Sequence, residues 1–132
     1  PDAAKIVLSS GAHITLVGLD VCEQITVMRD DLPWLSGSSK TANLTNVILN
    51  NWFKSHVDRE SYSLCDPLAG AAAISPTLLT RQQWSVAVDN REGEYKGKTV
   101  AVRGEGQVRV AFGVDVELSK RLMMNLLNGG SE

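Results

Sequence analysis

The segment of this sequence best suited to chemistry is Cys65-Asp66-Pro67, which is followed by small residues as far as Ile74. Proline is favoured at the first position of a helix, so the pattern places Asp66 at the N-cap of a helix over residues 67–74. A carboxylate at a helix mouth can accept backbone N–H hydrogen bonds, or it can reach a metal ion or a polar ligand. Two interpretations of Asp66 therefore stand, a plain helix cap and a ligand-binding group.

Other candidate site residues lie next to this segment or shortly before it. A free thiol is mostly protonated at neutral pH, so Cys65 can donate a proton or a hydrogen bond. Free cysteine also serves as a small buried hydrophobe, and both interpretations of Cys65 stay open. Phe53 and His56 lie shortly upstream of Cys65. The neighbouring Trp52 shares an apolar helical stripe and is predicted to lie in the core.

Histidine and cysteine suggest a zinc site in principle, but their spacing does not support one. The four residues involved would be His13, Cys22, His56 and Cys65. They contain no C-x-x-C pair or other zinc-ligand spacing. His13 begins an apolar segment, which indicates a structural role. We therefore predict no zinc site.

The elements that must position these residues alternate between helices and strands. Asp2 is predicted to cap a short helix that ends at Gly11. The continuous apolar run over residues 14–19 predicts a strand that is buried on both faces. A brief helical turn is expected over residues 31–35. The longest helix is predicted over residues 40–56, and its apolar stripe consists of Leu44, Val47, Ile48 and Trp52.

The second half of the chain has the pattern of three strands and a final helix. Alternating apolar residues predict strands over residues 84–88, 100–102 and 108–112, with glycine turns between them. Asp115 is predicted to cap a helix whose apolar stripe runs from Leu118 to Leu127. Such alternation indicates one α/β domain, with an open, partly parallel sheet flanked by helices. Ligands of such sheets bind beyond the carboxyl ends of the strands.

Composition excludes several classes of protein. The formal net charge of −2 and the isoelectric point near 5.7 give no indication of a nucleic-acid-binding surface. No apolar stretch approaches the roughly 20 residues that a membrane-spanning helix needs. No secretory signal is visible, and the two cysteines do not suggest a disulfide framework, so we expect a cytoplasmic protein. A length of 132 residues is enough to bury a core.

Several segments, in order along the chain, resemble the nucleoside hydrolases, calcium-dependent enzymes that cleave the N-glycosidic bond of ribonucleosides. Residues 63–79 resemble the C-terminal metal-binding motif of that family. Residues 1–7 and 13–21 resemble the helix and strand that follow its substrate-binding segment. Residues 108–117 are similar to its last strand and the start of its final helix. The resemblance covers essentially residues 1–132 and implies the C-terminal portion of a nucleoside hydrolase domain.

The resemblance implies a role for each candidate residue. Asp66 matches the family's C-terminal calcium ligand. Cys65 stands where many members carry a histidine that protonates the departing base, and some members carry cysteine there. Phe53 and His56 lie in the region from which the family brings aromatic or histidine side chains toward the nucleobase.

Two parts of the family's site are missing from this sequence. The aspartate cluster D-x-D-x-x-x-D-D has no match, since Asp30-Asp31 lacks the upstream acids. The segment that grips the ribose hydroxyls is also absent. We therefore expect the isolated chain to be inactive, to bind no calcium at Asp66, and to self-associate or to pair with an N-terminal fragment. The alternative is a non-catalytic module that folds and self-associates without activity.

Overall fold

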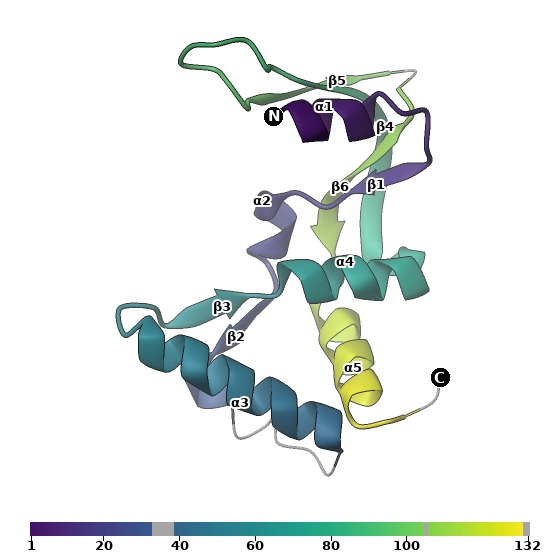
Figure 1. The fold of residues 1–132 in the computed structure, drawn as a ribbon. Coiled ribbons are helices and arrows are strands. Elements are labelled where there is room, and N and C mark those ends of the chain that lie inside the picture. Colours follow the sequence, from purple (N-terminus) through teal and green to yellow (C-terminus); the bar gives the residue numbers. More distant parts are fainter. Residues whose placement is uncertain (33–38, 105, 131–132) are drawn as a thin grey trace. The chain divides into compact units, whose positions relative to one another are not determined.

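The computed structural model describes residues 1–32, 39–104 and 106–130, and its chain divides into two compact units. Unit 1 consists of Pro1–Gly18 and Thr80–Phe112. Unit 2 consists of Leu19–Leu79 and Gly113–Glu132. Both units are therefore built from two segments that are distant in the sequence (Figure 1).

Unit 1 is organised around a four-stranded sheet with the order β1-β6-β4-β5. Its strands are β1 (Ile14–Leu16), β4 (Leu79–Val88), β5 (Thr99–Arg103) and β6 (Val108–Val114). β1 pairs in parallel with β6, whereas β4 and β5 are antiparallel. The sheet is therefore mixed, and the predicted α/β fold with a partly parallel sheet is confirmed. The three strands expected in the second half of the chain are all present.

The start of the chain differs from the prediction in two respects. Helix α1 (Asp2–Leu8) has Pro1 at its N-cap, so Asp2 lies inside the first turn and is not the cap. β1 has only three residues, and Thr15 is exposed. The prediction of a strand over residues 14–19 buried on both faces was wrong because β1 is an edge strand, with β6 on one side only. Leu19 begins another helix and is 63% exposed.

The sheet of unit 1 carries an aromatic pair and a close backbone approach. The rings of Trp84 and Phe112 lie 5.0 Å apart, centroid to centroid, at an angle of 44°. Gly106 is buried against the backbone of Trp84. A Cβ atom at position 106 would lie 1.8 Å from the carbonyl carbon of Trp84, so this position requires glycine.

In its described residues, unit 2 is mainly helical and contains a two-stranded antiparallel sheet (Figure 1). Its α-helices are α2 (Leu19–Cys22), α3 (Lys40–Ser55), α4 (Cys65–Ile74) and α5 (Val116–Leu127), and its 3₁₀ helices are η1 (Arg29–Asp31) and η2 (Pro76–Leu78). β2 (Thr26–Met28) and β3 (Ser61–Ser63) are antiparallel. Of the helical turn expected over residues 31–35, Asp31 belongs to η1, and residues 33–35 lie outside the described residues.

Helix α3 has the predicted extent but buries a different face. Leu44, Val47 and Ile48 are 60%, 55% and 57% exposed. The buried residues of α3 are Ala42, Leu49 and Phe53. The prediction of the buried stripe was wrong because α3 carries two apolar stripes. The stripe that contains Phe53 is the one that packs in the core, against Val27 of β2 and Leu32.

The two helices that follow begin in different ways. Asp115 caps α5 as predicted, since its Oδ1 accepts the N–H of Leu118 at 2.9 Å. α4 begins at Cys65, two residues earlier than predicted, with Leu64 at its N-cap. Pro67 is therefore the third helical residue, which is tolerated because the N–H groups of a first turn have no intrahelical partner. In the described part of the chain, no helix combines the length and apolarity that crossing a membrane requires.

Candidate functional site

A cavity of about 430 Å³ in unit 2 brings together most of the candidate residues. His56, Cys65 and Asp66 line it together. They come from the C-cap of α3 and the first two positions of α4. The full lining consists of Trp52, His56, Arg59, Ser61, Tyr62, Ser63, Cys65 and Asp66. Its volume lies in the range of small-molecule sites.

Phe53 is the one predicted contact that the structure excludes from the cavity. Its side chain is 1% exposed and belongs to the core cluster of unit 2. Trp52 meets it edge-on at 5.1 Å, and the guanidinium of Arg29 lies 5.0 Å from its ring centroid. Phe53 does not line this cavity because its ring is enclosed by its neighbours, and its contact with a nucleobase stays a prediction.

Trp52 and His56 form the aromatic wall of the cavity. Their rings stack with centroids 4.4 Å apart and an angle of 15°. Tyr62 meets the indole of Trp52 edge-on at 4.8 Å. Trp52 is partly buried against the core, as predicted, but it also lines the cavity. Planar groups arranged in this way suit a planar, aromatic ligand.

The thiol of Cys65 is held by a second cysteine. Cys22 is 3% exposed and shares a side-chain hydrogen bond with the half-buried Cys65. Burial first, then this hydrogen bond and the nearby Cys65, Asp20 and Asp66, raise the pKa of Cys22 to about 11. The bond raises that pKa because it favours the protonated Cys22 thiol.

Asp66 is exposed at the second position of α4. Within the described residues, its carboxylate takes part in no hydrogen bond or ion pair, and α4 has no side-chain cap. The expectation that Asp66 caps this helix was therefore wrong. Its negative charge lies in the first turn, where the helix dipole favours an anion. The carboxylate is thus available to a ligand in the cavity.

The residues of this chain do not form a complete calcium site. Calcium takes six to eight oxygen ligands, usually several of them carboxylates. Among the described residues, Asp66 is the one carboxylate lining the cavity, where it is accompanied by the hydroxyls of Ser61 and Ser63. Across residues 1–32, 39–104 and 106–130, no group of three or more His, Cys, Asp or Glu side chains is placed to hold a metal ion.

Arg29 positions the loop that carries part of the cavity, and sequence analysis did not identify it. Its guanidinium donates to the carbonyls of Phe53, at 3.2 Å, and Arg59, at 3.4 Å. Its backbone N–H donates to the carbonyl of Glu60 at 3.2 Å. No sequence pattern indicated this role. Arg29 contacts the loop just before β3, and β3 has only three residues, which is too short for an alternating pattern to reveal a strand.

Comparison with known proteins assigns the chain to a family. The profile of the inosine-uridine preferring nucleoside hydrolases matches residues 1–121. The chain belongs to the nucleoside hydrolase family. This confirms the resemblance of the sequence, and it applies to nearly the whole chain.

Individual relatives agree with this assignment. The chain is 32% identical over 123 residues to the non-specific ribonucleoside hydrolase RihC of Salmonella enteritidis, and the match covers 89% of this chain but 40% of RihC. A plant nucleoside hydrolase is similar with a TM-score of 0.83 and 26% identity, over 97% of this chain and 45% of the plant chain. A purine-preferring ribonucleoside hydrolase from Gardnerella vaginalis is similar with a TM-score of 0.77 and 30% identity. This match covers 98% of this chain and 44% of the Gardnerella chain. This nucleoside hydrolase chain therefore spans less than half the length of these relatives.

Proposed function

We propose that this chain is the C-terminal portion of a calcium-dependent nucleoside N-ribohydrolase, and that it holds the nucleobase and one metal-binding carboxylate. The observation that carries the proposal is the single cavity lined by His56, Cys65 and Asp66 in a chain of this family. The relatives are described as ribonucleoside hydrolases, which supports a ribonucleoside substrate. One is non-specific and another prefers purines, so the preferred base is left open.

The proposed chemistry is divided between this chain and residues outside it. Cleavage of an N-glycosidic bond needs a stabilised ribosyl cation, an activated water and a departing base that accepts a proton. Asp66 would provide one negative charge near the ribose. Calcium, when bound, would hold water and ribose hydroxyls. The other calcium ligands and the catalytic base would come from the portion that matches the rest of the relatives.

Self-association, or pairing with an N-terminal fragment, is part of the same proposal. β1 lies at an edge of the sheet of unit 1. In unit 2, Leu44, Val47 and Ile48 leave an exposed apolar stripe on α3. Exposed strand edges and apolar surface promote association. We also propose a cytoplasmic location, since both cysteines are free thiols.

A chimera with RihC tests the catalytic proposal. This chain would replace the segment of RihC that it matches, and base release from inosine and uridine would be measured with calcium or with a chelator. We expect chelator-sensitive hydrolysis by the chimera and none by the isolated chain. Asp66→Ala should lower kcat by more than the roughly 10- to 100-fold that an outer-shell partner contributes at a metal site. The exposed Asp58, which does not line the cavity, provides the matched control Asp58→Ala.

Two results would contradict the proposal. One is a chimera that folds, as judged by circular dichroism, but shows no chelator-sensitive hydrolysis. The other is hydrolysis by the isolated chain that is abolished by Asp66→Ala, since this would show that the 132 residues contain a complete site.

A non-catalytic module is the second candidate function. The specific observation in its favour is that Asp66 is the one carboxylate around the cavity. Finding the aspartate cluster D-x-D-x-x-x-D-D upstream in the parent reading frame would favour the enzyme, and its absence there would favour the module.

A further inference from the structure

The imidazole of His56 is held so that one ring nitrogen remains available. Its Nδ1 lies 2.8 Å from the carbonyl oxygen of Trp52. A carbonyl oxygen only accepts, so Nδ1 must carry the proton of this bond. The backbone N–H of His56 donates to the same oxygen at 3.0 Å. The stacked indole also fixes the plane of the ring, which leaves Nε2 as the ring atom for a ligand.

The surroundings of His56 suit a cation better than those of Cys65. The face of an indole attracts a positive charge, and the ring of Trp52 lies 4.4 Å from that of His56. His56 is exposed, so solvent can return a proton to it. Cys65 offers a neutral thiol, which is a weak hydrogen-bond donor, whereas an imidazolium donates a strong, charge-assisted hydrogen bond. Histidine is also the residue type that changes charge between about pH 5 and 8.

We propose that His56, rather than Cys65, is the group that protonates the departing nucleobase, and that it acts through Nε2. This inference rests on the proposed function. As the bond between C1′ and the base nitrogen breaks, its electron pair leaves with the base. The base accepts the Nε2 proton of the imidazolium, which becomes a neutral imidazole protonated on Nδ1. Water adds to C1′ and releases a proton, and solvent restores the Nε2 proton, so one water is consumed overall.

Trp52 is a positioning residue in this scheme. It acts on the imidazole through its ring face and its carbonyl oxygen, and it orients Nε2 without donating a proton itself. The other titratable side chains that line the cavity are Arg59, Tyr62, Cys65 and Asp66.

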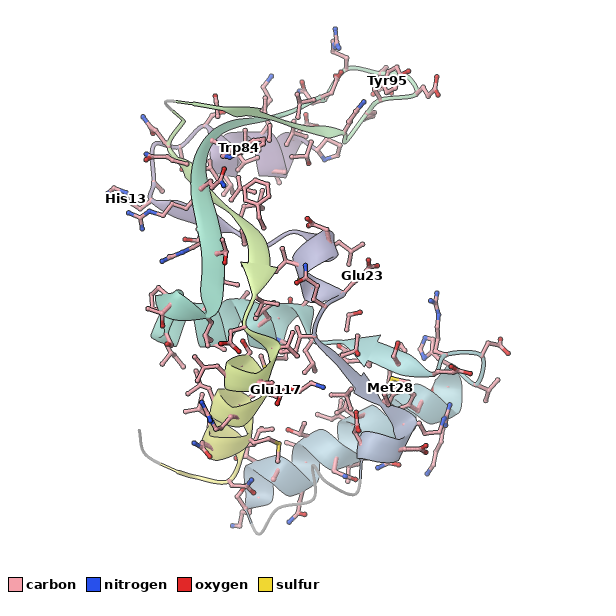
Figure 2. All side chains as sticks on the ribbon, turned by 180° about the vertical axis from the view of Figure 1, so that it is seen from behind. His13, Glu23, Met28, Trp84, Tyr95 and Glu117 are labelled. Atoms are coloured by element: carbon pink, nitrogen blue, oxygen red, sulfur yellow. The ribbon has the colours of Figure 1, made fainter. Side chains whose placement is uncertain are left out.

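The first test is nuclear magnetic resonance of the 132-residue chain with ¹⁵N-labelled histidine. The chain has two histidines, and His13 lies before β1 in unit 1 with its side chain pointing away from the strands, so it is a natural control (Figure 2). Signals are assigned with His13→Ala. We expect neutral His56 to carry its proton on Nδ1. Added hypoxanthine, a free base that needs no metal, should shift the Nε2 signal of His56 and leave His13 unchanged. A His56 protonated on Nε2 when neutral would overturn the proposal.

The second test measures hypoxanthine affinity by calorimetry between about pH 5 and 8. The wild-type chain should bind more tightly as the pH falls. His56→Ala should weaken binding at low pH by at least about 10-fold, as expected for a lost hydrogen bond to a charged group. His56→Gln, which can donate a hydrogen bond but gains no charge, should remove the pH dependence. His13→Ala, in unit 1, should change the affinity less than about 2-fold.

Equal affinity of the wild-type chain and His56→Ala, or no binding by a folded wild-type chain, would overturn the inference. A pH dependence that is lost in Cys65→Ser instead would assign the role to Cys65. Base binding in these assays needs neither calcium nor a complete catalytic site. Failure here is therefore distinguishable from failure of the chimera to hydrolyse nucleosides.

Discussion

Two aspartates, Asp89 in unit 1 and Asp66 in unit 2, differ in whether they have a hydrogen-bond partner. In unit 1, Asp89 receives hydrogen bonds from the side chain and backbone of Arg91, both at 3.0 Å. The hydrogen bonds and charge of Arg91 lower the pKa of Asp89 to about 2. In unit 2, Asp66 has no hydrogen-bond or ion-pair partner within the described residues.

Next to the Asp89–Arg91 pair, the side-chain amide of Asn90 forms hydrogen bonds with α1. It donates to Asp2 at 2.9 Å and accepts from Lys5 at 3.2 Å, so polar groups in unit 1 hold the helix to the loop after β4. The polar groups of unit 2 instead surround a cavity. The difference teaches that a partner, rather than the residue type, decides whether a carboxylate is structural or available to a ligand.

The comparison is tested most strongly with the two phenylalanines, one in each unit. Phe53 is 1% exposed in unit 2, whereas Phe112 is 41% exposed in unit 1. Phe53→Ala should lower the free energy of unfolding by about 3–5 kcal/mol, because it leaves a cavity in the core. Phe112→Ala should cost about 1 kcal/mol, the order of an aromatic pair. Urea denaturation measures both, and a larger loss in Phe112→Ala would contradict this assignment of the core.

A second test addresses the close backbone approach in unit 1. Gly106→Ala places a methyl group 1.8 Å from the backbone of Trp84, which cannot move as a flexible side chain would. We expect a loss of about 1–3 kcal/mol or more, as for other overpacked sites. Thermal unfolding followed by tryptophan fluorescence measures the loss. An unchanged melting temperature would show that this approach is not part of the fold.

The matched glycine in unit 2 should behave in the opposite way. Gly70 lies inside α4, lines an apolar cavity of about 370 Å³, and has no atom within 4 Å of the position of an added Cβ. Gly70→Ala should stabilise the chain by about 0.5–1 kcal/mol, because alanine favours a helix interior. The same denaturation assay applies, and a destabilised variant would show that unit 2 is packed more tightly at α4 than the structure indicates.

The smallest expected effect is the pH dependence of the Asp89 pair. The pKa of Asp89 falls from its ordinary 3.8 to about 2 in the folded chain. As the pH falls, the unfolded chain therefore binds a proton at Asp89 at a higher pH than the folded chain does. The stabilisation is complete above about pH 4 and is lost as the pH falls through about 2. The effect is small because Arg91 is 85% exposed. Acid titration of stability should be flatter in Asp89→Asn, and identical curves would show that the pair contributes nothing.

The sequence predicted the fold class and the elements with strong periodicity. The strands of the second half, α3 and the cap at Asp115 are confirmed. The short elements β2, β3 and α2 were missed, because three or four residues do not establish a period. The buried face of α3 was predicted wrongly, because two apolar stripes compete and tertiary packing selects the one with Phe53.

The candidate site was predictable in its residue types but not in its arrangement. The segment beginning at Cys65 indicated a site, and His56 was placed upstream of it. No pattern indicated that the ring of His56 stacks on Trp52 or that Cys22 lies beside Cys65. Such contacts depend on how α2, α3 and α4 pack with strands β2 and β3, and the local sequence pattern does not contain that information.

The pairing of β1 with β6 has a consequence for the order of folding. The partners of residues 14–16 are residues 108–110, which lie far along the sequence and are synthesised later. Closing so long a loop costs conformational entropy before the contacts that offset this cost have formed. Contacts between such distant residues therefore form slowly. A ribosome would release β1 before β6 exists, so β1 lacks this partner strand until β6 has been made. Chaperone binding or aggregation of nascent chains should therefore concentrate on the first segment of unit 1.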